Sequence, residues 1–130
     1  MVKKRGRTMM AEILIVDDDA VIRETLYELL SEKYHCTAAG TGNEALALLR
    51  QKRFDVVLTD LSMPGLCGSE LLHRIVAEFP GTPVIMISGL SDQEQGEALL
   101  KRGLFEYLLK PFRLEAVEES VARAIASQQE

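Results

Sequence analysis

Short aliphatic runs alternate along the chain with segments in which apolar residues recur every three or four positions. The runs are EILIV (12–16), HCTAAG (35–40), FDVVLTD (54–60), TPVIMIS (82–88) and LFEYLLK (104–110). Each run precedes a segment with helical periodicity. These segments are VIRETLYELL (21–30), NEALALLRQ (43–51), SELLHRIVAEF (69–79), DQEQGEALLKR (92–102) and RLEAVEESVARAI (113–125). The pattern therefore predicts five consecutive strand–helix units.

Helical connections between successive strands force those strands to run parallel. Strands this continuously apolar are typical of a sheet that is covered on both faces, so the predicted fold is α/β and doubly wound. The chain has 130 residues, 47% of them hydrophobic, which is enough for the core of one domain. We expect this domain to span residues 11–127, with residues 1–10 as a basic, disordered tail.

The charge of the chain is unevenly distributed. The net charge is −5, but Lys3, Lys4, Arg5 and Arg7 all lie in the tail, and the remainder has 11 basic against 20 acidic residues, a net charge of −9. An acidic body argues against direct nucleic-acid binding by the domain. The sequence has no apolar run long enough for a membrane span and no signal-peptide pattern, so we expect a cytoplasmic protein. Cys36 and Cys67 lack metal-ligand spacing and are expected to be free thiols.

Polar residues gather where the predicted strands end. Asp17 and Asp18 follow the first strand, Asp60 ends the third, Ser88 the fourth and Lys110 the fifth. In doubly wound sheets these ends form the rim where ligands bind. Three carboxylates there suit Mg²⁺, or Mn²⁺, while the lysine and the serine can contact phosphoryl oxygens. A carboxylate in this setting can attack an activated phosphoryl group, so the rim is predicted to be a phosphoryl-transfer site. The third aspartate of the run, Asp19, is expected to cap the following helix.

From residue 12 to about 126, the sequence resembles the receiver domain of bacterial response regulators. Four motifs carry the resemblance in the correct order and spacing: VDD (16–18), LTDLSMPGLCG (58–68), IMISG (85–89) and EYLLKPF (106–112). It implies a flavodoxin-like three-layer sandwich with a five-stranded parallel sheet in the order 2-1-3-4-5, as in chemotaxis regulators. It also implies a cis peptide bond between Lys110 and Pro111.

The resemblance assigns roles to individual residues. Asp60 is implied to be the phosphoacceptor, and Asp17, Asp18, Asp60 and the backbone carbonyl of Ser62 are implied to bind magnesium. Ser88 and Lys110 would contact the phosphoryl group.

The implied switch surface consists of the fourth helix, the fifth strand and the fifth helix, with Tyr107 as its rotating aromatic residue. Tyr107 as ordinary core packing remains an alternative. The fourth helix has few apolar positions and contains Gly96, which costs roughly 1 kcal/mol relative to alanine in a helix interior. We therefore expect this helix to be weakly anchored.

The implied function is that of a two-component receiver. It would take a phosphoryl group from a histidine kinase or a histidine phosphotransfer protein and pass a change of shape to a downstream partner. No catalysis is expected beyond self-phosphorylation and self-dephosphorylation.

Two short segments also fit other functions. ILIVDDDAV (13–21) resembles the start of haloacid-dehalogenase-like phosphatases, with Asp17 as nucleophile and Asp19 as acid/base. That family ends its site with an acidic pair, whereas the last strand here ends in a lysine and a proline. GTGNEA (40–45) fits a dinucleotide-binding turn, but it follows the second strand, and the chain is too short for the usual six-stranded sheet with a substrate domain.

Overall fold

The structure is a computed structural model that describes residues 10–89 and 93–128. Strands and helices alternate throughout, as the sequence pattern predicts. The strands are β1 (Glu12–Val16), β2 (His35–Ala39), β3 (Val56–Asp60), β4 (Val84–Ser88) and β5 (Glu106–Leu109). The helices are α2 (Ala20–Leu30), α3 (Gly42–Gln51), α4 (Gly68–Glu78), α5 (Gln93–Leu100) and α6 (Leu114–Gln128). Except for Met10, the predicted N-terminal tail lies outside the described residues.

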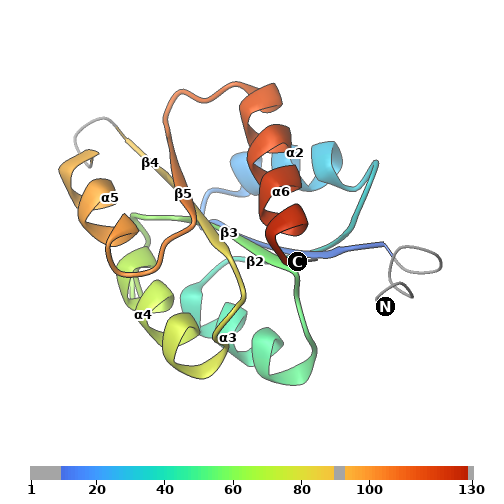
Figure 1. Cartoon of the computed structure of the whole chain (residues 1–130). Helices are drawn as coiled ribbons and strands as arrows, with labels where there is room; N and C mark the ends of the chain where they lie inside the picture. The colour runs from blue at the N-terminus through green and yellow to red at the C-terminus, as the bar shows by residue number, and fades with distance from the viewer. Residues whose placement is uncertain (1–9, 90–92, 129–130) are drawn as a thin grey trace.

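The five strands form one parallel sheet in the order β2-β1-β3-β4-β5, which confirms the predicted topology. Helices α2 and α6 cover one face, and α3, α4 and α5 cover the other (Figure 1). Alternate residues of a strand point to opposite faces, so Ile13 and Ile15 of β1 pack toward α2 and α6, while Leu14 and Val16 pack toward the opposite helices. The result is the expected three-layer sandwich.

Burial separates the central strands from the edge strands. Every residue of β3 and β4 is buried, and β1 is buried apart from the half-buried Glu12. In the edge strand β2 only Cys36 and Ala39 are buried, and β5 is half-buried along its length. The prediction of burial on both faces is therefore right for the three central strands. At the two edges both faces are packed but burial is incomplete, because each edge strand lacks a neighbouring strand on one side.

The connection from β3 to α4 is unusually close to the sheet. A Cβ atom on Gly68 would lie 2.6 Å from the carbonyl oxygen of Asp60 and 2.7 Å from the Cα of Leu61. The amide of Gly68 donates a hydrogen bond to the carbonyl of Leu61 at 2.9 Å. Glycine thus lets α4 begin directly against the end of β3, and this close packing fixes the loop that follows Asp60.

Candidate functional site

Three carboxylates meet at the carboxyl ends of β1 and β3. Asp17, Asp18 and Asp60 each place one oxygen within 4.8 Å of the other two. The pairing of β1 with β3 brings them together, because Val16 lies opposite Thr59 in the sheet. Asp17 and Asp60 are only 1% and 5% exposed, whereas Asp18 is open to solvent. The rim predicted from the strand ends therefore exists, and it has one accessible and two buried acids.

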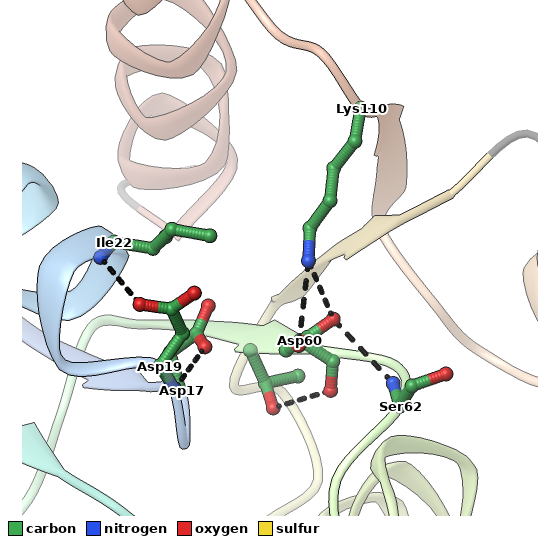
Figure 2. A network of polar contacts seen from close by, with 7 residues as sticks. Asp17, Asp19, Ile22, Asp60, Ser62 and Lys110 are labelled. Carbon is green, nitrogen blue, oxygen red and sulfur yellow. Dashed lines mark hydrogen bonds and ion pairs between the residues drawn. The ribbon is translucent and has the colours of Figure 1, made fainter.

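The turn from β1 to α2 separates the roles of its aspartates. Asp19 caps α2, since its side chain accepts hydrogen bonds from the amides of Val21 at 2.9 Å and Ile22 at 3.3 Å. The amide of Asp19 in turn donates to Oδ1 of Asp17 at 2.9 Å (Figure 2). The other oxygen of Asp17, Oδ2, is buried without a hydrogen-bond partner in the described structure. Asp19 is a cap, as predicted, and Asp17 keeps one oxygen for a ligand.

Lys110 brings a positive charge to the third carboxylate. Its Nζ lies 3.5 Å from both Oδ1 and Oδ2 of Asp60, and Figure 2 shows it reaching across from the segment after β5. Its amide donates to the carbonyl of Ser88 at 2.7 Å, and its peptide bond to Pro111 is cis, which confirms the expected isomer. Lys110 is thus held at the rim from both its main chain and its side chain.

Ser88 and Ser62 approach Asp60 from different elements. Ile87 lies opposite Asp60 in the sheet, so Ser88 is the next residue along the neighbouring strand. Ser88 is 1% exposed, and its hydroxyl has no hydrogen-bond partner among the described residues. The amide of Ser62 lies 3.4 Å from Oδ1 of Asp60, while its side chain is exposed beside a hollow of about 460 Å³. The site therefore contains a buried hydroxyl with unused hydrogen-bonding capacity.

The electrostatics of the rim are unfavourable in the absence of a ligand. Burial is the main cause that raises the pKa of Asp17 to about 6, and the neighbouring charge of Asp60 contributes to this rise. Burial also raises the pKa of Asp60, although Lys110 partly offsets the effect. Buried carboxylates close to one another disfavour ionisation unless a cation compensates for them. Clustered carboxylate oxygens, one of them buried and unpaired, fit a hard divalent cation such as Mg²⁺.

Two contacts at this rim were missed by sequence reasoning. The hydroxyl of Thr59 donates to the carbonyl of Asp60 at 3.1 Å, and Nη1 of Arg23 donates to the carbonyl of Asp17 at 2.6 Å. Thr59 adjoins the motif aspartate and could have been noticed. Arg23 lies within a helical pattern on the first turns of α2, and its spacing from Asp17 carries no recognisable signal.

Tyr107 packs against α5. Its ring lies so close to Gly96 that a Cβ atom there would be 2.9 Å from the nearest ring atom. Its hydroxyl lies 3.4 Å from Oε2 of Glu97. The side chain is half-buried and also packs against the core on the α3, α4 and α5 face. Tyr107 therefore links β5 to α5.

The glycine-rich turn after β2 is organised as a helix start. Thr41 caps α3 by accepting the amide of Glu44 at 3.1 Å, and Glu44 accepts the amide of Gly40 at 2.7 Å. This reciprocal capping uses amides that a dinucleotide-binding turn would offer to a pyrophosphate. The structure therefore favours a structural role for the turn.

Comparisons with known proteins agree on one family. The family model for the response regulator receiver domain matches residues 13–122. The chain is 40% identical over 119 residues to the DNA-binding transcriptional regulator NtrC of Salmonella typhimurium, covering 91% of this chain and 25% of NtrC. It is 37% identical over 115 residues to the probable transcriptional regulatory protein TcrX of Mycobacterium tuberculosis, covering 88% of this chain and 49% of TcrX.

Solved structures give the same result. A response regulator receiver domain protein from Clostridium thermocellum superimposes with a TM-score of 0.89 at 30% identity, covering 92% of this chain and 98% of that one. The receiver domain of NtrX from Brucella abortus gives a TM-score of 0.84 at 32% identity, covering 88% and 98%.

The matched region corresponds to one part of these regulators, because the chain spans a quarter of the length of NtrC and about half of TcrX. The haloacid-dehalogenase alternative finds no support in the comparisons, and its acid/base, Asp19, is engaged as a helix cap. None of the described helices has the length and apolar character that a membrane span requires. The chain belongs to the response regulator receiver domain family of two-component signalling.

Proposed function

We propose that Asp60 is the residue that accepts the phosphoryl group. The observation that carries this assignment is the position of its carboxylate, with the Lys110 amine 3.5 Å from both oxygens and the carboxylates of Asp17 and Asp18 beside it. Of the three acids, Asp60 is the one that an amine contacts directly. A positive charge there can compensate for the phosphoryl oxygens that arrive with the donor.

The transfer itself forms one bond and breaks one bond. A carboxylate oxygen of Asp60 attacks phosphorus, and the bond from phosphorus to the donor breaks with its electron pair leaving on the donor. The donor is a phosphohistidine of a histidine kinase or a phosphotransfer protein, whose imidazole nitrogen leaves. The product is an acyl phosphate on Asp60. Water later attacks phosphorus, and the bond from phosphorus to the Asp60 oxygen breaks. Inorganic phosphate leaves and the carboxylate is restored, so self-dephosphorylation returns the domain to its starting state.

Asp17, Asp18, Asp60 and the backbone carbonyl of Ser62 would hold the divalent cation. Mg²⁺, or Mn²⁺, supplies charge neutralisation for the carboxylates and the phosphoryl oxygens when bound. Ser88 has a buried hydroxyl with no partner among the described residues, so it is available to donate to a phosphoryl oxygen. Lys110 would pair with another oxygen.

The proposed switch surface consists of α5, β5 and α6, which are the fourth helix, the fifth strand and the fifth helix along the chain. Lys110 and Tyr107 lie close together in and after β5, so a change at the rim acts on the same short segment that contacts α5. Phosphorylation adds charge and acceptor oxygens beside Ser88 and Lys110. A downstream protein or effector domain would recognise the altered surface.

The assignment is tested by incubating the full chain with acetyl phosphate, with and without MgCl₂, and measuring its mass. Borohydride trapping then identifies the modified aspartate, with Asp60→Asn as the control. We expect one magnesium-dependent phosphoryl group on Asp60 and none on the variant. An adduct on Asp17 with release of phosphate would indicate a phosphatase instead. The absence of any adduct would contradict phosphoryl acceptance by this chain.

A further inference from the structure

Arg23 connects α2 to the main chain of the acidic turn. Its Nη1 donates to the carbonyl oxygen of Asp17 at 2.6 Å, a short charge-assisted hydrogen bond. Arg23 is half-buried. Its guanidinium lies beside Gly40, the residue after β2, where a Cβ atom would be 3.5 Å from Nη1. Its own amide donates to the carbonyl of Asp19 at 2.9 Å as part of the first turn of α2. Arg23 is therefore held in place by the helix that Asp19 caps.

The carbonyl that Arg23 contacts belongs to the peptide unit between Asp17 and Asp18. Asp17 is otherwise fixed by its amide, which donates to the carbonyl of Ala39 at 3.1 Å, and by its Oδ1, which accepts the amide of Asp19. Asp18, the residue that follows this peptide unit, is exposed. The orientation of this peptide plane sets the direction in which the Asp18 side chain leaves the backbone.

We propose that Arg23 is a positioning residue for the candidate metal site. By fixing the peptide between two of the three carboxylate residues, it keeps Asp17 and Asp18 directed toward Asp60. This inference rests on the proposed function, because it concerns the same magnesium site. Arg23 is assigned no direct contact with the cation or the phosphoryl group.

The sign of the effect on magnesium affinity separates this role from simple electrostatics. Removing a positive charge near a cation site strengthens cation binding by Coulomb's law. Removing a positioning contact weakens it, because the free ligands must be ordered when the cation binds. A residue that only stabilises α2 would change the stability of the protein and leave the affinity unchanged.

The test uses Arg23→Gln and Arg23→Lys in the full chain, with Arg50→Gln as the matched control. Arg50 makes a bidentate pair with Glu78 on helices away from the rim, at 3.0 and 2.9 Å, so its loss removes a comparable arginine contact. Affinity for MgCl₂ is measured by titration calorimetry. In the metal-free protein, exchange of the Asp19 amide is followed by nuclear magnetic resonance.

We expect Arg23→Gln to weaken magnesium binding about 10-fold, the lower end of what outer-shell partners contribute. Arg23→Lys keeps the charge but lacks the planar fork, so its loss should be smaller, about 3-fold. The Asp19 amide should exchange faster in both variants without metal. Arg50→Gln should bind magnesium as tightly as the original chain.

The outcomes distinguish this inference from the proposed function. If the original chain binds no magnesium, the proposed metal site itself is wrong. If it binds magnesium and Arg23→Gln binds equally or more tightly, the positioning role is overturned. Should Arg23→Gln fail to fold, Arg23→Lys decides, and an affinity and an amide exchange rate equal to those of the original chain would contradict the inference.

Discussion

At the scale of single residues, the acids of the site oppose the stability of the fold that positions them. Asp17 and Asp60 are both buried, burial raises the pKa of each, and the charge of Asp60 contributes to the rise at Asp17. Oδ2 of Asp17 has no hydrogen-bond partner in the described structure. Such an arrangement is typical of functional sites, where the buried charges serve to bind a ligand and do not stabilise the fold.

This conflict predicts that Asp17→Asn stabilises the metal-free protein near neutral pH. The pKa of Asp17 is about 6 in the folded state against 3.8 for an ordinary aspartate. Because the folded state holds this proton more tightly than the unfolded state, the free energy of unfolding is highest below pH 3.8 and falls as the pH rises through 6. At about 1.4 kcal/mol per pKa unit, the variant should gain roughly 1–3 kcal/mol at pH 7.5 and little below pH 4.

Urea unfolding with a chelator present, at pH 7.5 and at pH 4, measures this difference. Asparagine keeps an oxygen for the amide of Asp19, so that hydrogen bond is preserved. Asp55→Asn is the control, because Asp55 is another buried carboxylate that accepts a main-chain amide, that of Glu12 at 2.7 Å. We expect no gain there, and a loss of stability in Asp17→Asn at pH 7.5 would refute the prediction.

At the scale of elements, α5 buries few of its described side chains against the sheet. It is short, Leu99 is buried against the core, and Leu100 is 41% exposed. Gly96 was expected to lower its helical stability, and the structure adds that the glycine makes room for the Tyr107 ring. Gly96 therefore lowers the intrinsic stability of the helix and at the same time allows the helix to pack against Tyr107 of β5.

Replacing Gly96 with alanine should affect stability differently in two backgrounds. Alanine favours the helix by about 1 kcal/mol, but its Cβ would lie 2.9 Å from the Tyr107 ring. We expect no stabilisation in the original chain and a gain of about 1 kcal/mol when Tyr107→Ala has removed the ring. Urea unfolding of the four proteins in this double-mutant cycle gives the coupling. An equal gain in both backgrounds would show that the ring does not depend on Gly96.

At the scale of the whole molecule, the candidate metal site exists only in the folded chain. Asp17 and Asp60 are far apart in sequence and meet because β1 and β3 are neighbours in the sheet. A cation that binds this arrangement and not the unfolded chain must stabilise the entire domain. The site therefore connects the stability of the fold to the presence of its ligand.

Magnesium is accordingly predicted to raise the Tm. At a concentration 100 times Kd, one bound ion adds about 2.7 kcal/mol to the free energy of unfolding. Thermal unfolding in MgCl₂ and in chelator at matched ionic strength measures the rise. Asp17→Asn should start from a higher Tm in chelator and gain less from magnesium. Equal gains in both proteins would exclude Asp17 from the metal site.

The sequence alone determined the elements, the parallel topology and the membership of the rim. These properties depend on local apolar periodicity and on the rule that the ends of parallel strands share one edge, so a linear pattern is sufficient. Asp17, Asp60 and Lys110 were placed correctly because each directly ends or follows a strand. The family motifs supplied the strand order and the cis isomer.

Tertiary structure decided which atoms of these residues remain available. Oδ2 of Asp17 is left unpaired by the packing around it. The contact of Arg23 with the acidic turn and that of the Tyr107 ring with Gly96 join segments that are separate in the pattern. Whether a hydrogen bond or a ring contact forms between elements depends on differences in distance of a few tenths of an ångström and on side-chain direction. Periodicity carries neither quantity, and packing of helices against the sheet fixes both.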